Sequence, residues 1–187
     1  RSNRGLSIQI RDGGNVENVT YSNIMIETRR FCPDWWGTAE PIVITTFNRD
    51  ENTKSGHIKN IRFFNVTAKG ENGVLIHGNA DNVIEDITFE NCRIELSKTS
   101  KWECGLYDLR PCLDYGVEKS DNSAFFLRWA KDVLLLKTKT SWGSLCENYK
   151  HAVDAENVEN LEMLRFEGKA ATPDTEDIRL NNVKLVR

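Results

Sequence analysis

The sequence lacks the features that mark several large classes of protein. It has no apolar run long enough to cross a bilayer. Its formal net charge of −3 gives no sign of the basic surface with which proteins bind nucleic acid or membrane surfaces. No CxxC motif or closely spaced His/Cys pair fits a zinc site, and no long amphipathic helix is visible. We therefore expect no metal, no cofactor, and no nucleic-acid or membrane partner.

What the sequence does contain is a short repeat. It reads Asn or Asp, aliphatic, any residue, apolar, any residue, usually Asn, usually apolar. Its copies start at Asn18, Asn60, Asp86, Asp132, Asn160 and Asp177. Apolar residues alternate within each copy, which indicates a strand with one buried face. The second Asn stands where the alternation breaks, and Asn suits a corner because it tolerates left-handed backbone.

A third apolar run, such as 42–44 or 74–76, precedes each copy. We therefore predict an all-β, right-handed parallel β-helix, a single-stranded solenoid with three strands per rung, forming one domain over residues 1–187. The spacing from Ile61 to Ile87 suits one rung. An antiparallel β-sandwich is the rival, but the aligned Asn corners favour the solenoid. Neither end carries a cap, so we expect the C-terminal part of a longer solenoid whose open ends favour self-association.

The chain has 5 cysteines, an odd number. Cys92 falls at an inward strand position, where we expect a buried free thiol. Cys104 and Cys112 share one inserted segment and could pair. Cys32 and Cys146 lie about three rungs apart, too far for a direct bridge unless their loops reach. Two alternatives remain open: all five cysteines are reduced, or one disulfide forms.

The insertions into the repeat share one corner. They cover residues 29–40, 97–123 and 144–150. Insertions at one corner stack into a wall beside the sheet, and this wall is rich in aromatic rings, Arg and carboxylates. That composition is typical of a sugar-binding cleft, where rings stack on sugar faces and charged groups bond hydroxyls or carboxylates. The candidate substrate-binding residues are Trp35, Trp36, Glu40, Trp102, Tyr107, Asp108 and Arg110.

Several of these residues also have a structural interpretation. Trp35 and Trp36 could cover the corner as a small satellite core. Arg110 could form a loop-internal ion pair with Asp108, and Glu40 could cap a strand. Other polar residues, His77, His151 and Asp154, fit a structural role: His77 at a solvated strand edge, the other two beside a short buried run.

Several stretches resemble the polygalacturonase-like enzymes, glycoside hydrolase family 28 of the pectin-lyase-like superfamily, and look like the C-terminal half of a bacterial member. The resemblance runs over nearly the whole chain. Its most specific stretches are 4–6, 13–19, 35–42 (Trp-Trp-Gly-Thr-Ala-Glu-Pro-Ile), 71–73, 107–111 and 151–157. It implies hydrolysis of a pectin-type or related polysaccharide with inversion, and an extracellular or periplasmic location.

The family's catalytic motifs, Asn-Thr-Asp-Gly, Asp-Asp and Gly-His-Gly, do not occur in this chain, so no catalytic residue is assigned. The family's carboxylate-binding Arg-Ile-Lys element corresponds to Ser7-Ile8-Gln9. Neutral Ser and Gln cannot form the charge-assisted pair that a uronate favours, and Arg11, which lies close, is the candidate substitute. Two alternatives stand beside the glycosidase hypothesis: a non-catalytic carbohydrate-binding chain, and a purely structural one.

Overall fold

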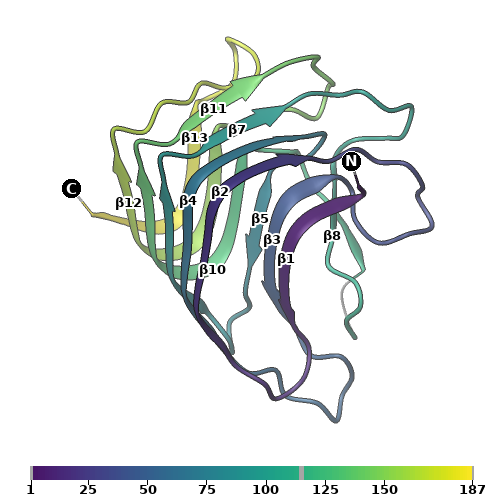
Figure 1. Cartoon of the computed structure of the whole chain (residues 1–187), viewed down its shortest axis with the longest axis vertical. Coiled ribbons are helices and arrows are strands. Elements are labelled where there is room, and N and C mark those ends of the chain that lie inside the picture. The colour runs from purple at the N-terminus through teal and green to yellow at the C-terminus, as the bar shows by residue number, and fades with distance from the viewer. Residues whose placement is uncertain (1, 114–115, 187) are drawn as a thin grey trace.

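The computed structural model describes residues 2–113 and 116–186, and this part of the chain is built from strands and loops (Figure 1). It contains no helix that could cross a membrane. The strands are β1 (Arg4–Ile10), β2 (Val16–Glu27), β3 (Glu40–Thr46), β4 (Ile58–Gly70), β5 (Val74–His77), β6 (Ile84–Glu90), β7 (Arg93–Leu96), β8 (Leu106–Asp108), β9 (Val117–Lys119), β10 (Phe125–Leu136), β11 (Lys139–Trp142), β12 (Val153–Leu164) and β13 (Ile178–Val186).

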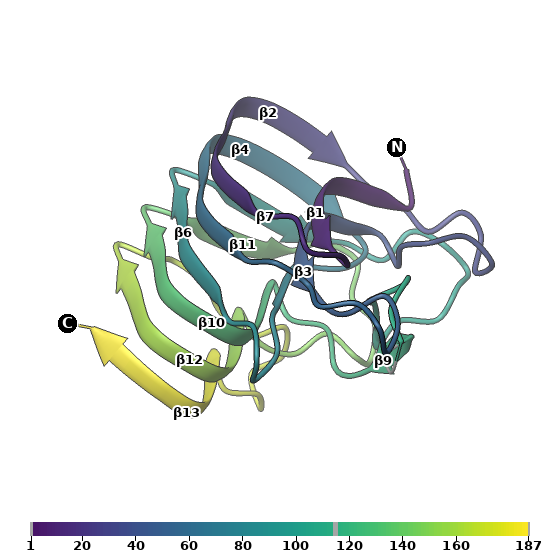
Figure 2. The same ribbon diagram turned by 90° about the horizontal axis from the view of Figure 1, so that it is seen from below.

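Parallel pairing joins nearly all of these strands into one sheet. The sheet has 11 strands and curls around the core, with β2 and β13 towards opposite ends (Figures 1 and 2). Strands β8 and β9 form a separate antiparallel hairpin against one face. The all-β prediction and the parallel arrangement are therefore confirmed, and the rival antiparallel sandwich is excluded.

The prediction of a right-handed parallel β-helix with three strands per rung is wrong. At the predicted corners within β2 and β4 the chain runs on as one strand, whereas β6 ends at Glu90, just before Asn91, and β7 begins at Arg93. Strand β4 is 13 residues long and passes through both Asn60 and Asn65, and β2 passes through Asn18 and Asn23 over 12 residues. These long strands join the segments into one curled 11-stranded sheet.

Left-handed backbone explains why the strands bend without ending. Asn18, Asn23, Asn60 and Asn65 have φ values of 59°, 57°, 56° and 53°. One left-handed residue turns the strand direction, and Asn accepts this conformation at lower cost than most residues. The alternation of inward and outward side chains is interrupted at each bend. A corner between two separate strands would interrupt the alternation in the same way.

The bends of neighbouring strands are joined by side-chain amides. Asn60 donates from Nδ2 to Oδ1 of Asn18 at 2.6 Å. Asn65 donates to Asn23 at 3.1 Å, and Asn91 donates to Asn65 at 2.6 Å. Asn65 both donates and accepts, so at its level the side-chain hydrogen bonds run across three neighbouring segments as a ladder. A slip of one residue would break them, so the ladder favours a single register.

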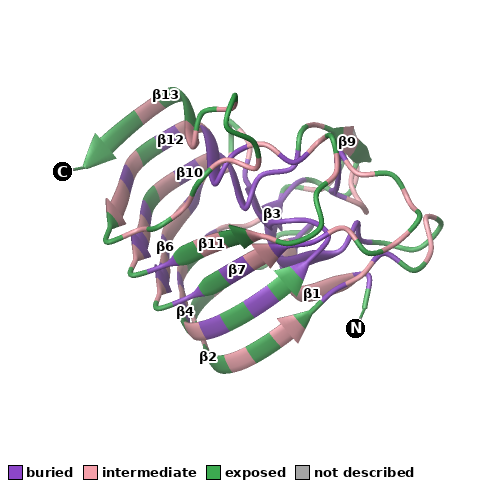
Figure 3. Ribbon diagram, turned by 90° about the horizontal axis from the view of Figure 1, so that it is seen from above, coloured by how far each residue is buried: buried purple, intermediate pink, exposed green. Residues whose placement is uncertain are grey.

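The core is made of rows of apolar side chains on the inner surface of the curl. Figure 3 marks the buried residues along the strands in purple. Tyr21, Phe63 and Phe89 stack on successive strands, with ring centroids 5.3 and 4.6 Å apart. Cys92 is fully buried and outside any disulfide, as predicted, and burial raises the pKa of its thiol to about 11.

We predict that Asn65→Ala lowers the free energy of unfolding by about 1–3 kcal/mol, measured by urea denaturation. The substitution removes two side-chain hydrogen bonds and forces Ala into left-handed backbone. Asn65→Gly is the matched control, because it removes the same bonds but relieves the backbone conformation. Gly should therefore be less damaging than Ala, and equal effects of the two would argue against a strained bend.

Candidate functional site

Three loop segments meet on one side of the sheet. We call them together the loop wall: residues 29–39, 97–113 with 116–123, and 144–150. Arg30 donates from Nη1 to the carbonyl oxygen of Glu103 at 3.1 Å. Trp102 donates from Nε1 to the carbonyl oxygen of Phe31 at 3.1 Å, and the amide of Lys98 donates to Ser144 at 2.8 Å. The predicted gathering of the insertions is thus observed.

Glu71 anchors the second segment of the loop wall. Its nearly buried carboxylate accepts hydrogen bonds from Lys98 Nζ at 3.1 Å and from the hydroxyls of Thr99 and Ser100, both at 2.6 Å. Burial acts to raise the pKa of Glu71, but these three bonds outweigh it and hold the pKa below its usual value. The ionised carboxylate therefore fixes residues 98–100 in place.

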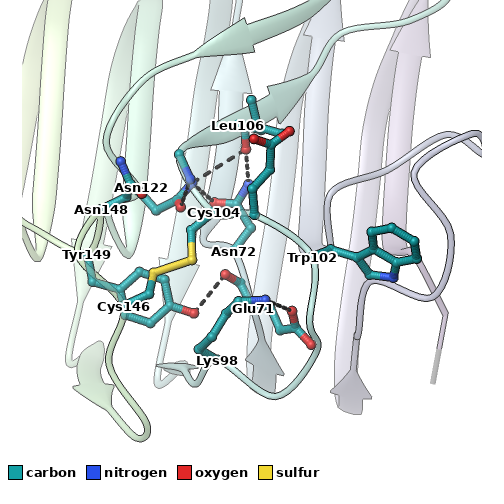
Figure 4. Close-up of a disulfide and its surroundings, with 12 residues drawn as sticks. Glu71, Asn72, Lys98, Trp102, Cys104, Leu106, Asn122, Cys146, Asn148 and Tyr149 are labelled. Atoms are coloured by element: carbon teal, nitrogen blue, oxygen red, sulfur yellow. Dashed lines mark hydrogen bonds and ion pairs between the residues drawn. A yellow bond between two sulfur atoms is a disulfide. The ribbon is translucent and has the colours of Figure 1, made fainter.

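Two buried side-chain amides, those of Asn72 and Asn122, support the same segment (Figure 4). Asn72 donates from Nδ2 to the carbonyl oxygen of Leu106 at 2.7 Å. Asn122 donates to Oδ1 of Asn72 at 2.9 Å, and accepts from the amide of Gly105 at 2.7 Å. Both side chains are almost fully buried. Because buried polar groups need such partners, this network holds the start of β8 rigidly.

A disulfide joins the second and third segments. It links Cys104 to Cys146 (Figure 4). The alternative of reduced cysteines throughout is wrong, and so is the suggested pairing of Cys104 with Cys112. The physical reason is the hairpin of β8 and β9, which places Cys112 beyond β8, where its Sγ contacts the carbonyl oxygen of Leu109 at 3.2 Å. Cys32 lies outside any disulfide.

An open pocket of about 770 Å³ lies beside the disulfide. Its lining is polar and carries both charges, with one aromatic ring. The lining side chains include Trp102, Lys98, Glu103, Lys119, Asp121 and Asn148. The predicted residue Trp102 thus stands at a real concavity of the loop wall.

Trp35 and Trp36 are exposed on the first segment of the loop wall, by 73% and 50%. They do not bury a satellite core. The carbonyl oxygen of Trp35 accepts a bond from Arg110 Nη2 at 3.4 Å, so the second segment supports the backbone under these rings. Both indoles present apolar surface to solvent.

Three of the residues predicted to contact substrate, Glu40, Tyr107 and Asp108, are buried instead of exposed. Tyr107 stacks on Phe126 with ring centroids 4.1 Å apart, and its hydroxyl accepts from the amide of Ser123 at 3.0 Å. Burial raises the pKa of Tyr107 above its usual range. Glu40 is fully buried and accepts from the amides of Thr38 at 2.7 Å and of Asp108 at 3.0 Å.

Asp108, the third buried residue, forms the loop-internal ion pair with Arg110. Arg110 donates from Nε and Nη2 to the two carboxylate oxygens at 2.9 and 3.0 Å. The amide of Gly37 donates to the same carboxylate at 2.5 Å, which ties the first segment to the second. Burial acts to raise the pKa of Asp108, but these bonds outweigh it and lower the pKa. The loop wall is therefore held in place by three buried side chains, those of Glu40, Tyr107 and Asp108.

Arg11, which the sequence offers as a substitute for an Arg-Ile-Lys element, is also committed internally. Its guanidinium donates to the carbonyl oxygens of Pro111 at 2.5 Å and Leu109 at 2.8 Å, and to the hydroxyl of Thr45 at 2.8 Å. Burial lowers the pKa of Arg11 to about 10. Gln9 only approaches the carbonyl oxygen of Arg110 at 3.5 Å.

Sequence reasoning missed a charged pair and a charged group of three residues on the same face of the sheet. His77 is buried rather than a solvated edge residue, and its Nε2 lies 3.3 Å from Glu118 Oε2 on the hairpin. Asp154 is buried and accepts paired bonds from Arg128 and Arg179 at 2.8–3.1 Å. No spacing rule could have found these pairs, because their members come from different loops and strands.

Within residues 2–113 and 116–186, no group of three or more His, Cys, Asp and Glu side chains is arranged to hold a metal ion. Comparison of the chain with protein-family models, with curated proteins and with solved structures found no match.

We predict that Asp108→Asn lowers the free energy of unfolding by about 3 kcal/mol at pH 7, because it leaves Arg110 without its buried anion and removes one of the two buried carboxylates beside Arg4. The lowered pKa means that this stabilisation is present above the unfolded-state pKa of about 3.9 and is lost as pH falls through the folded-state pKa.

The measurement is urea denaturation of both proteins at pH 7, 4 and 3, with exposed Asp174→Asn as the matched control. The difference between wild type and Asp108→Asn should shrink at pH 3, while the control should stay close to wild type throughout. A difference that is constant with pH would contradict an ionised Asp108.

Proposed function

We propose that the chain binds a polysaccharide or oligosaccharide on the loop wall, as part of a glycoside hydrolase related to the polygalacturonases. The observation that carries the proposal is the open polar pocket beside Trp102. Sugars offer apolar C–H faces for aromatic rings and hydroxyls for carboxylates, amides and ammonium groups. The pocket presents each of these partners within one concavity.

The rigidity of the wall supports binding. Trp102 is held by its own bond to Phe31 and by the anchor at Glu71, which fixes the preceding residues. The disulfide closes the other side of the pocket. A surface that is already ordered loses less entropy when it binds, so weak sugar contacts can add up to measurable affinity.

The charges favour neutral sugars over uronates. Lys98 is already paired with Glu71, which leaves Lys119 as the more available cation, and it shares the pocket with Glu103, Asp121 and Glu147. A uronate would meet more carboxylates than free cations here, and like charges repel. The internal commitment of Arg11 points the same way.

Cleavage with inversion would need two carboxyl groups about 6.5–9.5 Å apart on either side of the scissile bond. The proposal of hydrolysis is supported by the resemblance to the polygalacturonases, and no such pair is assigned. An extracellular or periplasmic location belongs to the same proposal and is supported by the disulfide, since such bonds persist in oxidising compartments. Carbohydrate binding without cleavage is the second candidate.

We predict that Trp102→Ala weakens binding of neutral plant oligosaccharides about tenfold or more, because a stacking platform is lost. Isothermal titration calorimetry with galactan-, xylan- and galacturonan-derived oligosaccharides measures this. Trp129→Ala is the control, since Trp129 lies on β10 away from the loop wall, and it should bind like wild type.

Trp35→Ala should weaken longer oligosaccharides more than short ones, because Trp35 stands outside the pocket. Unchanged binding in both Trp102→Ala and Trp35→Ala would show that the wall has no role in sugar recognition. A reducing-end assay on the same sugars separates the two candidates: release of new ends supports the glycosidase, and binding without release supports the non-catalytic chain.

A further inference from the structure

A second cavity, much smaller than the open pocket, lies inside the loop wall. Its volume is about 10 Å³. Arg30 borders it from the first segment, and Glu71, the anchor of the second segment, borders it too. The small cavity adjoins the open pocket next to the disulfide (Figure 4), because four residues of the second segment line both of them: Lys98, Glu103, Cys104 and Leu106.

The guanidinium of Arg30 is buried and only partly bonded. Arg30 is 7% exposed, and its Nη1 donates to the carbonyl oxygen of Glu103 at 3.1 Å. Among the residues that the structure describes, its buried Nε has no hydrogen-bond partner. A buried N–H group needs an acceptor, above all when it belongs to a charged side chain. Because Arg30 lines the small cavity, that acceptor belongs inside it.

The donors of the other amide and ammonium side chains in this lining are already used. The two amides, Asn72 and Asn122, each donate two hydrogen bonds from Nδ2. The ammonium of Lys98 donates three, one to Glu71 and two to Ser100, at 2.8–3.1 Å. The guanidinium is therefore the charged group of the lining that still has a hydrogen to donate.

The lining also offers acceptors with capacity to spare. Within the described part of the chain, Oε1 of Glu71 accepts a single hydrogen bond, from Thr99 at 2.6 Å. The carbonyl oxygen of Glu103 likewise accepts one, from Arg30. Each of these oxygens has two lone pairs. A ligand in the cavity can therefore donate hydrogen bonds as well as accept one.

The charges around the cavity disfavour ions. An anion would lie beside the carboxylate of Glu71 and could not donate a hydrogen bond to it. A cation would lie beside Arg30 and Lys98 and could not accept a hydrogen bond from Nε. Water is neutral and both accepts and donates. A cavity of about 10–15 Å³ on this measure is the size that holds one water molecule.

We propose that one water molecule is bound in this cavity and bridges Arg30 to Glu71. Its oxygen accepts a hydrogen bond from Nε of Arg30, and one of its hydrogens is donated to the Glu71 carboxylate. A bridging water is nearly as favourable as a direct hydrogen bond. It therefore completes a buried ion pair between the first segment and the anchor of the second. This site is separate from the open pocket and does not depend on carbohydrate binding.

A crystal structure of the wild-type chain grown in sodium bromide, at a resolution that shows ordered water, tests the proposal directly. We expect one water peak at about 2.7–3.2 Å from both Nε of Arg30 and a carboxylate oxygen of Glu71. We expect no anomalous signal from bromide there. A bromide peak would show an anion site and overturn the proposal. A cavity without a peak, or a direct bond from Nε to the protein, would also overturn it.

Oxygen-17 relaxation dispersion counts the long-lived internal water molecules in solution. Arg30→Met keeps a long side chain but removes the donor, so this variant should hold one such water fewer than wild type. Arg93→Met, which changes an exposed Arg on β7, is the matched control and should keep the wild-type number. Circular dichroism confirms the fold of both variants, and the crystal structure decides alone if Arg30→Met does not fold. Equal numbers in wild type and folded Arg30→Met would contradict the bridging water.

Discussion

The stacked left-handed bends are the constraint on which the rest of the structure depends. A strand turns at Asn65 without leaving the sheet, because the left-handed φ changes its direction while its amide side chain bonds Asn23 on one neighbour and Asn91 on the other. Each strand must place its bend over that of its neighbour to keep these bonds. The curl and the apolar rows both follow from this single register.

The same register explains where the loop wall lies. Loops inserted at equivalent positions of neighbouring strands lie next to one another, and buried polar contacts join them. Glu71 fixes the second segment, Asp108 ties it to Gly37 on the first, and the disulfide joins Cys104 to Cys146 on the third. The pocket beside Trp102 is therefore a product of the sheet geometry and of these internal partners.

The inward rows and a buried Cys92 could be predicted from the alternation, and the parallel arrangement from the repeat with its aligned Asn residues. The distinction between a corner and a bend could not, because a left-handed Asn65 interrupts the alternation in the same way whether the strand ends or continues. The burial of Tyr107 and Asp108 also escaped prediction, since composition indicates a cleft without showing which side chains find partners inside it. The partner of Cys104 depended on the path of a hairpin that spacing does not reveal.

Backbone hydrogen exchange at the bends, followed by NMR, tests the continuous curled sheet most directly. The amide of Asn91 donates to the carbonyl oxygen of Leu136 at 3.0 Å, and that of Lys137 donates to Leu164 at 2.8 Å. If the sheet runs through the bends, these amides exchange as slowly as those of the flanking strand residues. Fast exchange at Asn91 and Lys137 between slowly exchanging flanks would show that hydrogen bonding between neighbouring segments stops at the bends, and would contradict the single curled sheet.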